Sequence, residues 1–265
     1  MSNFNAEQYW ETRLRKNFTV VGVGNQRMGK QYNEWLYRIR KYIFPKLIRK
    51  NNLDVRDKTV LDIGSGTGFY IDRWKELQAA TITGVDITHI AVEKLAQKYP
   101  DIPFIQADIG GELIPPLAGQ QYDIVSCIDV LYHIMDDERY ARAISNIYTL
   151  LKPGGVFLFS ENFLHHAKAR LPSQTNRSLR EIETLVTEAG FQIQGRYPMF
   201  IVMAYPVDTR SRFWKLLWLV IFRIGTLNEV FGFIFGAILF PIELLLLALF
   251  KESPTSEMMV CKKIV

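Results

Sequence analysis

Apolar and polar positions along residues 59–200 follow a pattern that predicts strands alternating with helices. Short apolar runs, typical of buried parallel strands, lie near 59–63, 81–86, 102–107, 122–128 and 155–161. Helical patterns follow near 68–79, 88–99, 136–151 and 178–190, and two further strands are expected near 191–200 and 257–265. The alternation predicts parallel strands joined by right-handed crossovers, and therefore an α/β fold with a doubly wound sheet.

The segment before the first strand, residues 1–58, is predicted to form a helical cap. Residues 5–16 and 31–50 have helical patterns, whereas the glycine-punctuated stretch 18–30 predicts a loop. Pro45 is expected to kink or break the second helix. The cap carries 13 Lys or Arg and 5 Asp or Glu, in a chain of net charge +5. This basic region could face anionic lipid, nucleic acid or a phosphorylated substrate, or be a solvated helix face.

Residues 201–256 form an insertion between the two last strands. It contains the apolar runs 213–224 and 230–250, and the second has one charge, Glu243, in 21 residues. That length is enough for a membrane span of about 20 residues. Because the flanking strands should belong to one sheet, however, the chain must return on the side from which it left. The 12-residue first run, about 18 Å long as a helix, is too short to cross.

We therefore expect the insertion to be a lid or a helical hairpin that contacts a membrane or a lipid-like substrate without crossing the bilayer. Pro241 should kink its second helix, and Glu243 would be costly at bilayer depth. The alternative is that both helices bury their apolar faces on the domain or in a homodimer.

The composition limits the domain organisation and the cellular location that the sequence predicts. A chain of 265 residues with 48% hydrophobic residues fits one α/β domain with an elaboration. Its two cysteines, Cys127 and Cys261, provide no disulfide framework, and no spacing of Cys and His is typical of a metal site. The N-terminus shows no signal-peptide pattern. These features predict a cytoplasmic protein, with a membrane-peripheral position if the insertion contacts lipid.

The stretch VLDIGSGTG at residues 60–68 is the strongest chemical signal. Its glycines, Gly64, Gly66 and Gly68, follow a buried strand and precede a helix. Glycines here let the backbone turn tightly and approach a ligand, towards which the free N–H groups of the helix also point. The spacing differs from the dinucleotide fingerprint G-x-G-x-x-G, because position 69 is Phe.

Within this stretch, residues 62–68 (DIGSGTG) resemble motif I of class I S-adenosylmethionine-dependent methyltransferases. Later features resemble the same family in order: Asp86 ends the second strand, Asp108 ends the third, YDIVSCIDVLYHI spans 122–134 and LLKPGG spans 150–155. The resemblance implies a seven-stranded, mostly parallel sheet whose last strand is antiparallel and lies between strands five and six. It divides the protein into a cap (1–58), a cofactor-binding Rossmann-like domain (59–200 plus 257–265) and the insertion (201–256).

The resemblance also implies S-adenosylmethionine as cofactor and a set of residues that hold it. Asp62 would anchor the amino group, the glycine loop would pass under the methionine part, Asp86 would bind the ribose hydroxyls, and Asp108 with Ile109 would flank adenine. The full expected set is Asp62, Gly64, Ser65, Gly66, Gly68, Asp86, Ile87, Asp108, Ile109 and Ile128. For each acid the alternative is a helix cap or a surface position.

Methyl transfer from a sulfonium is an in-line displacement, so a general base is optional. His133 and Glu161 are the candidate catalytic residues, because His133 follows the fourth strand and Glu161 ends the fifth at the carboxyl edge of the sheet, where ligands bind. His133 could equally be structural. Tyr37, Tyr132 and His165 are candidate substrate contacts, although aromatic residues of the cap could simply pack on the sheet, and His165 could be solvated.

These observations predict a methyltransferase acting on oxygen or nitrogen of a small, apolar or lipid-linked acceptor. One alternative is a soluble natural-product methyltransferase whose insertion forms a dimer interface. Others are a nicotinamide-dependent oxidoreductase and a non-catalytic binding protein. Nucleic acid is not expected as the acceptor, because IDVLYH stands where a base-flipping NPPY-like tetrapeptide would follow strand four.

Overall fold

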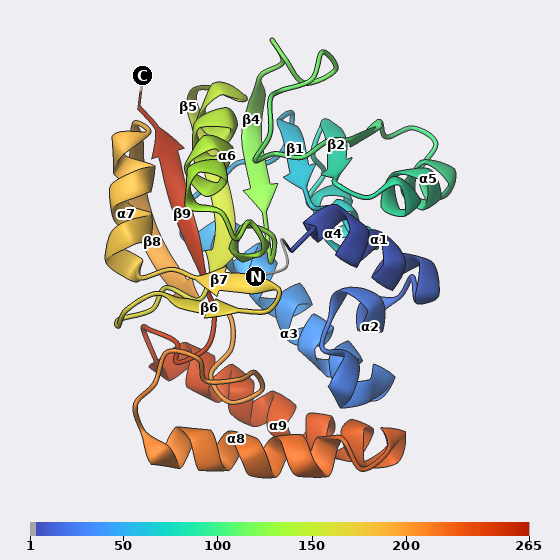
Figure 1. Ribbon diagram of the computed structural model, residues 1–265, viewed down its shortest axis with the longest axis vertical. Coiled ribbons are helices and arrows are strands. Elements are labelled where there is room, and N and C mark those ends of the chain that lie inside the picture. Colours follow the sequence, from blue (N-terminus) through green and yellow to red (C-terminus); the bar gives the residue numbers. More distant parts are fainter. Residues whose placement is uncertain (1–3, 265) are drawn as a thin grey trace.

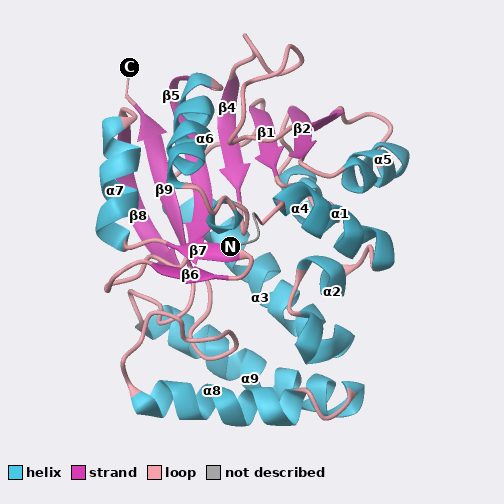
Figure 2. Ribbon diagram, in the orientation of Figure 1, coloured by secondary structure: helices cyan, strands magenta, loops and turns pink. Residues whose placement is uncertain are grey.

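The computed structural model describes residues 4–264 and has a seven-stranded sheet at its centre (Figures 1 and 2). The strand order is β3-β2-β1-β4-β5-β9-β8. The strands are β1 (Thr59–Ile63), β2 (Thr81–Asp86), β3 (Phe104–Gln106), β4 (Tyr122–Cys127), β5 (Leu151–Glu161), β8 (Phe191–Pro198) and β9 (Glu257–Lys263). The first five are parallel, whereas β9 is antiparallel to both β5 and β8. The predicted sheet, including the position of its last strand, is confirmed.

Helices cover both faces of the sheet. One face packs α6 (Asp137–Thr149) and α7 (Leu179–Glu188), which lie in front of it in Figure 1. The other face packs α3 (Gly29–Lys50) and α4 (Phe69–Glu76), while α5 (His89–Lys98) lies beside β2 and β3. Alternate residues of β1 go to opposite cores, Val60 to the face of α3 and Leu61 to the face of α6. Such two-sided burial explains why the strands have apolar runs rather than alternating patterns.

The N-terminal cap consists of α1 (Ala6–Lys16), α2 (Val20–Val23), the 3-10 turn η1 (Gln26–Met28) and α3. The predicted loop at 18–30 is therefore wrong in part, because two short helical turns lie within it. Of the kink or break expected at Pro45, the break is wrong, since α3 continues through the proline to Lys50. Phe44, Leu47 and Ile48 are buried on either side of the proline, and their packing on the sheet holds the helix together.

The insertion folds into α8 (Arg212–Gly225) and α9 (Glu229–Leu249), two helices at the bottom of Figure 1. α9 packs along α3, and a Cβ added at Gly232 or Gly236 would lie against Tyr32 or within 2.1 Å of the Trp35 ring. These glycines let the two helices approach closely. α9 is unbroken at Pro241.

Glu243 is fully buried and ties α9 to the segment that follows β8. Its carboxylate accepts the backbone N–H groups of Ile201 (2.5 Å), Val202 (2.9 Å) and Met203 (3.2 Å). The single acid of the long apolar run is therefore a tether within the protein.

A second, small sheet consists of the hairpin β6 (Ala169–Leu171) and β7 (Gln174–Asn176). The sequence analysis predicted no strand in these residues. The hairpin crosses the lower edge of the main sheet in Figure 1, and its tip contributes to the cavity described next.

Candidate functional site

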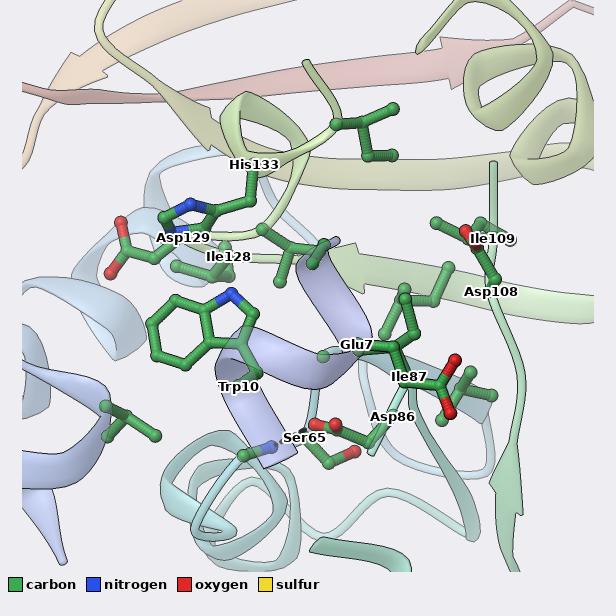
Figure 3. Close-up of a pocket in the computed structure, with 18 of the residues that line it drawn as sticks. Glu7, Trp10, Ser65, Asp86, Ile87, Asp108, Ile109, Ile128, Asp129 and His133 are labelled. Carbon is green, nitrogen blue, oxygen red and sulfur yellow. Dashed lines mark hydrogen bonds between the residues drawn. The ribbon is translucent and has the colours of Figure 1, made fainter. Parts of the chain in front are cut away.

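A cavity of about 1300 Å³ lies at the carboxyl ends of β1, β2 and β4. Side chains of α1, α2 and α3 close it from the other side, including Trp10, Leu14, Val23 and Tyr37. In an open α/β sheet this edge is where ligands bind. Figure 3 shows His133, Asp129 and Trp10 grouped on one side, and Asp86, Asp108 and Ile109 on the other.

The glycine loop forms the floor of the cavity. Gly64 has φ +73°, a conformation that favours glycine, and a Cβ at this position would stand 2.1 Å from Cγ2 of Val130. The N–H groups of Gly64 and Ser65 donate to the carbonyl of Val85 at 2.7 and 3.0 Å, which fixes the loop against β2. Gly64, Ser65 and Gly66 line the cavity, whereas Gly68 lies outside the lining and caps α4.

Asp86 holds the loop from the end of β2. Its Oδ2 accepts the N–H of Gly66 at 2.8 Å, and its Oδ1 accepts the N–H and hydroxyl of Thr88 at 2.9 and 2.7 Å. Burial raises the pKa of this carboxyl, while the three hydrogen bonds work in the opposite direction. A carboxylate has about four acceptor sites, so one remains for a ligand hydroxyl.

Asp62 lies beneath the loop, outside the residues that line the cavity. Its Oδ1 accepts the hydroxyl of Ser126 at 2.7 Å, and its Oδ2 is buried without a hydrogen-bond partner among residues 4–264. Burial raises the pKa of this carboxyl to about 7. An unpartnered buried carboxylate oxygen is costly, and a cationic group in the cavity would lower that cost.

The far wall of the cavity is apolar and is bounded by an acid. Ile87 and Ile109 line it together with Asp108, whose Oδ1 accepts the N–H of Gly110 at 2.9 Å and whose Oδ2 pairs with Arg139. Ile128 lines the cavity nearer to Asp129 and His133 (Figure 3). Aliphatic side chains beside a carboxylate suit a flat heteroaromatic ring with a polar edge.

Comparison with known proteins agrees with this geometry. Residues 60–155 match the profile of a methyltransferase domain. The ubiquinone biosynthesis O-methyltransferase of Pseudomonas putida is 33% identical over 119 residues, which cover 43% of this chain and 50% of that protein. The enzyme of the same description from Pseudomonas savastanoi pv. phaseolicola is 34% identical over an equal share. The match thus spans about half the length of these relatives.

Residues 60–155 therefore form a methyltransferase domain, and the sheet around them has the class I S-adenosylmethionine-dependent methyltransferase fold.

Solved structures of other methyltransferases have the same fold. Magnesium protoporphyrin IX methyltransferase from Synechocystis PCC 6803, solved with bound S-adenosylmethionine, aligns over 99% of both chains with a TM-score of 0.57 and 14% identity. The N-methyltransferase NodS from Bradyrhizobium japonicum WM9, in complex with S-adenosylhomocysteine, aligns over 98% of this chain and 99% of its own, with a TM-score of 0.56 and 14% identity.

The residues of the cavity fit S-adenosylmethionine. The cofactor has a sulfonium and an ammonium group, and the buried free oxygen of Asp62 and the carboxylates that line this methyltransferase's cavity complement positive charge. When bound, the cofactor supplies a methyl group that its positive sulfur activates for displacement.

His133, in the 3-10 turn η2 (Leu131–His133), lines the cavity opposite the glycine loop. Its Nδ1 lies 2.7 Å from the carbonyl oxygen of Ser173 in the hairpin tip. Because a carbonyl only accepts, Nδ1 carries the proton and Nε2 is left as an acceptor. Burial lowers the pKa of this imidazole to about 4, so the ring is neutral at pH 7. The edge of the ring meets Trp10 of α1 with centroids 4.9 Å apart.

The sequence analysis missed Asp129, which follows β4 and lines the cavity beside His133. Its φ is +61°, which is uncommon for a residue with a side chain and is typical of strained functional sites. Ser160 donates to its Oδ1 at 3.0 Å, and Arg40 of α3 forms an ion pair with its Oδ2. The sequence could have pointed to Asp129 only through its position just after a strand. Its two partners lie 31 and 89 residues away in the sequence, so no local pattern reveals them.

Three tyrosines surround this ion pair: Tyr37, Tyr70 and Tyr132. Burial raises the pKa of Tyr37 to about 12 and those of Tyr70 and Tyr132 well above the usual value, so all three are neutral donors at pH 7. Tyr37 and Tyr70 line the cavity, whereas Tyr132 lies behind it. The hydroxyl of Tyr70 is buried without a partner among the described residues.

Two other candidates lie away from the cavity lining. Glu161 is fully buried beneath it, where burial raises the pKa of the carboxyl to about 8. His165 is half-exposed and pairs through Nδ1 with Asp208 at 2.5 Å, near the insertion. The structure therefore brings His133 and Tyr37 to the cavity, together with Asp129, and leaves Glu161, Tyr132 and His165 outside its lining.

Proposed function

We propose that this protein transfers the methyl group of S-adenosylmethionine to an oxygen or nitrogen atom of a small, apolar or lipid-linked acceptor. The observation that carries this proposal is the composition of the cavity lining outside the glycine loop. Aromatic and apolar side chains dominate there, namely Phe4, Trp10, Tyr37, Phe69, Tyr70, Leu171 and Pro172. Polar side chains such as His133 and Asp129 lie among them. Sites for apolar ligands combine such walls with polar groups that orient the ligand by a small number of hydrogen bonds.

The cofactor contacts in this proposal are the glycine loop from Gly64 to Gly66, Asp86 for the ribose, and Asp108 with the neighbouring isoleucines for adenine. Asp62 acts from beneath the loop on the positive end of the cofactor. Each assignment is supported by the position of the residue in or under the cavity and by its remaining capacity for hydrogen bonds.

His133 is the proposed general base, because its neutral ring presents Nε2 as an acceptor. In the transfer, the bond from sulfur to the methyl carbon breaks as the bond from carbon to the acceptor atom forms. The proton of the acceptor hydroxyl or amine passes to Nε2. Asp129, fixed by Arg40 and Ser160, would accept a hydrogen bond from the same acceptor and orient it.

The acceptor class is also supported by the relatives, which are described as O-methyltransferases of ubiquinone biosynthesis. We place the protein in the cytoplasm at a membrane surface, where an apolar acceptor would be available. Nucleic acid is disfavoured because several cationic side chains of the cap are engaged within the protein. Arg13 stacks over Trp10, Arg15 pairs with Glu11, and Arg40 pairs with Asp129.

The test uses S-adenosylmethionine with an isotopic label in the methyl group and an extract of bacterial membrane lipids and quinones as the acceptor source. We expect label in a product that partitions into organic solvent, and none with a Gly64→Ala variant. Label that appears only in water-soluble products of a cytosolic extract would favour the soluble alternative. A protein that binds S-adenosylhomocysteine but labels neither fraction would contradict the proposal.

A further inference from the structure

The outward faces of α8 and α9 form a continuous apolar surface. On α9 its exposed members are Val230, Phe231, Phe233, Ile234, Ile238, Ile242, Leu245 and Leu249, and on α8 they are Phe213, Leu216, Leu219 and Val220. Phe213 and Leu249 are 66% and 67% exposed. Monomeric proteins rarely expose apolar patches larger than a few hundred Å², and larger ones mark interaction sites.

This surface belongs to a fixed part of the fold. The inward face of the helix pair is packed, with Ile221 and Leu239 in the core and Gly236 against Trp35. Glu243 holds α9 to residues 201–203 by three hydrogen bonds. The helices therefore present their exposed faces without rearrangement, and only 22% of the most apolar 18-residue window of α9 is buried.

The acidic residues of the insertion have partners within the protein, whereas its basic residues do not pair with the described residues. All four of its acids have partners within the protein. Asp208 pairs with His165, and Glu252 pairs with Arg196. Glu229 accepts backbone N–H groups at the start of α3, and Glu243 accepts backbone N–H groups after β8. Its five bases, Arg210, Arg212, Lys215, Arg223 and Lys251, are all exposed and form no ion pair with the described residues. Three of them lie on α8, among its exposed apolar side chains. The surface therefore offers apolar area together with free positive charge.

α9 has the length and composition of a membrane span, but its attachments argue against crossing. β8 and β9 are paired at Pro198 and Glu257, so the insertion leaves and re-enters the same edge of the sheet. α8 has 14 residues, or about 21 Å at 1.5 Å per residue, which is short of a hydrocarbon core of about 30 Å. The pair can lie along a bilayer but cannot pass through it and return.

We propose that the exposed face of α8 and α9 binds the surface of an anionic lipid bilayer. The apolar side chains enter the boundary between headgroups and acyl chains, and Arg212, Lys215 and Arg223 contact anionic headgroups, as in interfacial amphipathic helices. A second copy of this chain would match the apolar area but would bring the same free positive charges together. This inference depends on the proposed function in one respect: it takes the membrane to be the source of the methyl acceptor.

The test is flotation of the full chain with vesicles of phosphatidylglycerol and phosphatidylcholine in equal parts, compared with vesicles of phosphatidylcholine alone. We expect binding to the anionic vesicles that weakens at high salt. Phe231→Ser with Leu245→Ser should weaken binding at least tenfold, and so should Arg212→Glu with Lys215→Glu. The control is Ile264→Ser, an exposed apolar residue beyond the end of β9 that should leave binding unchanged. Unchanged S-adenosylhomocysteine affinity reports that each variant is folded.

Three outcomes would overturn this proposal: wild-type protein that binds neither vesicle, binding that survives both double variants, and membrane association that resists carbonate extraction. A wild-type dimer in sedimentation equilibrium that dissociates with Phe231→Ser and Leu245→Ser, without vesicle binding, would assign the face to a second copy. Vesicle binding without any methyl transfer would instead contradict the proposed function and leave the docking surface standing.

Discussion

Replacing Asp86 tests whether the cofactor loop is held as the structure indicates. In the wild type, Oδ2 of Asp86 accepts the N–H of Gly66 at 2.8 Å. In Asp86→Asn, the side-chain amide oxygen can still accept from Thr88, but the amide NH₂ group replaces Oδ2 and cannot accept from Gly66. Losing a hydrogen bond to a charged acceptor costs about 1.5–3 kcal/mol, and about 1.4 kcal/mol corresponds to tenfold in affinity. We therefore expect S-adenosylhomocysteine to bind about 10- to 100-fold more weakly.

Stability should respond much less than affinity to this change. Burial raises the pKa of the Asp86 carboxyl, so its charge is itself a cost in the folded state, and the neutral amide removes that cost. Asp86→Ala should be more severe for both properties, because Gly66 and Thr88 lose their acceptor altogether.

The assay is isothermal calorimetry with S-adenosylhomocysteine, alongside thermal unfolding of the same samples. The control is Asp101→Asn, an exposed acid in the turn after α5. A folded Asp86→Asn variant with wild-type affinity would refute the assignment. A loss of affinity that only tracks a large fall in melting temperature would make Asp86 a structural residue.

Three further changes probe the site and the insertion. Gly64→Ala should weaken S-adenosylhomocysteine binding more than 100-fold in calorimetry, whereas Gly119→Ala, also at positive φ but with open space around it, should not. His133→Ala should lower turnover by about two to four orders of magnitude, and because burial lowers the pKa of His133 to about 4, the wild-type rate should show no imidazole step between pH 6 and 8; a step near pH 6.5 would contradict this. Glu243→Ala should lower the unfolding free energy in urea by about 3 kcal/mol or more, since three backbone N–H groups lose their acceptor. Burial raises the folded-state pKa of Glu243, so its contribution is complete below its ordinary pKa of 4.5 and the wild-type advantage should shrink as the pH rises above that value.

Local patterns and the family resemblance were enough to predict the proposed cofactor side of the cavity. The glycines at 64, 66 and 68 and the acid at 86 each follow a strand whose apolar run is readable by itself, and parallel strands bring their carboxyl ends to one edge. The side of the cavity around His133 and Asp129 was harder to predict from the sequence. Asp129 becomes a site residue through a left-handed backbone and through contacts with Ser160 and Arg40, which no local pattern encodes.

The same contrast holds for the insertion and the cap. Composition and the flanking strands predicted a helical hairpin at 201–256, and α8 and α9 confirm that secondary structure. Whether Glu243 faced lipid, solvent or protein depended on a backbone segment 40 to 42 residues earlier in the sequence. Pro45 remained within a helix because buried neighbours outweighed its local preference.

The sequence by itself determined the order of the strands of the main sheet and of the helices between them, because apolar periodicity acts over a few residues. Its motifs also carried the resemblance to the family and to the family's cofactor loop. Only the tertiary structure decided which side chains join His133 in the cavity, which tautomer His133 holds against Ser173, and which face of α8 and α9 stays uncovered. Those properties arise from contacts between residues far apart in the sequence. Local preference allows several arrangements of these side chains, and close packing in the folded protein permits one of them.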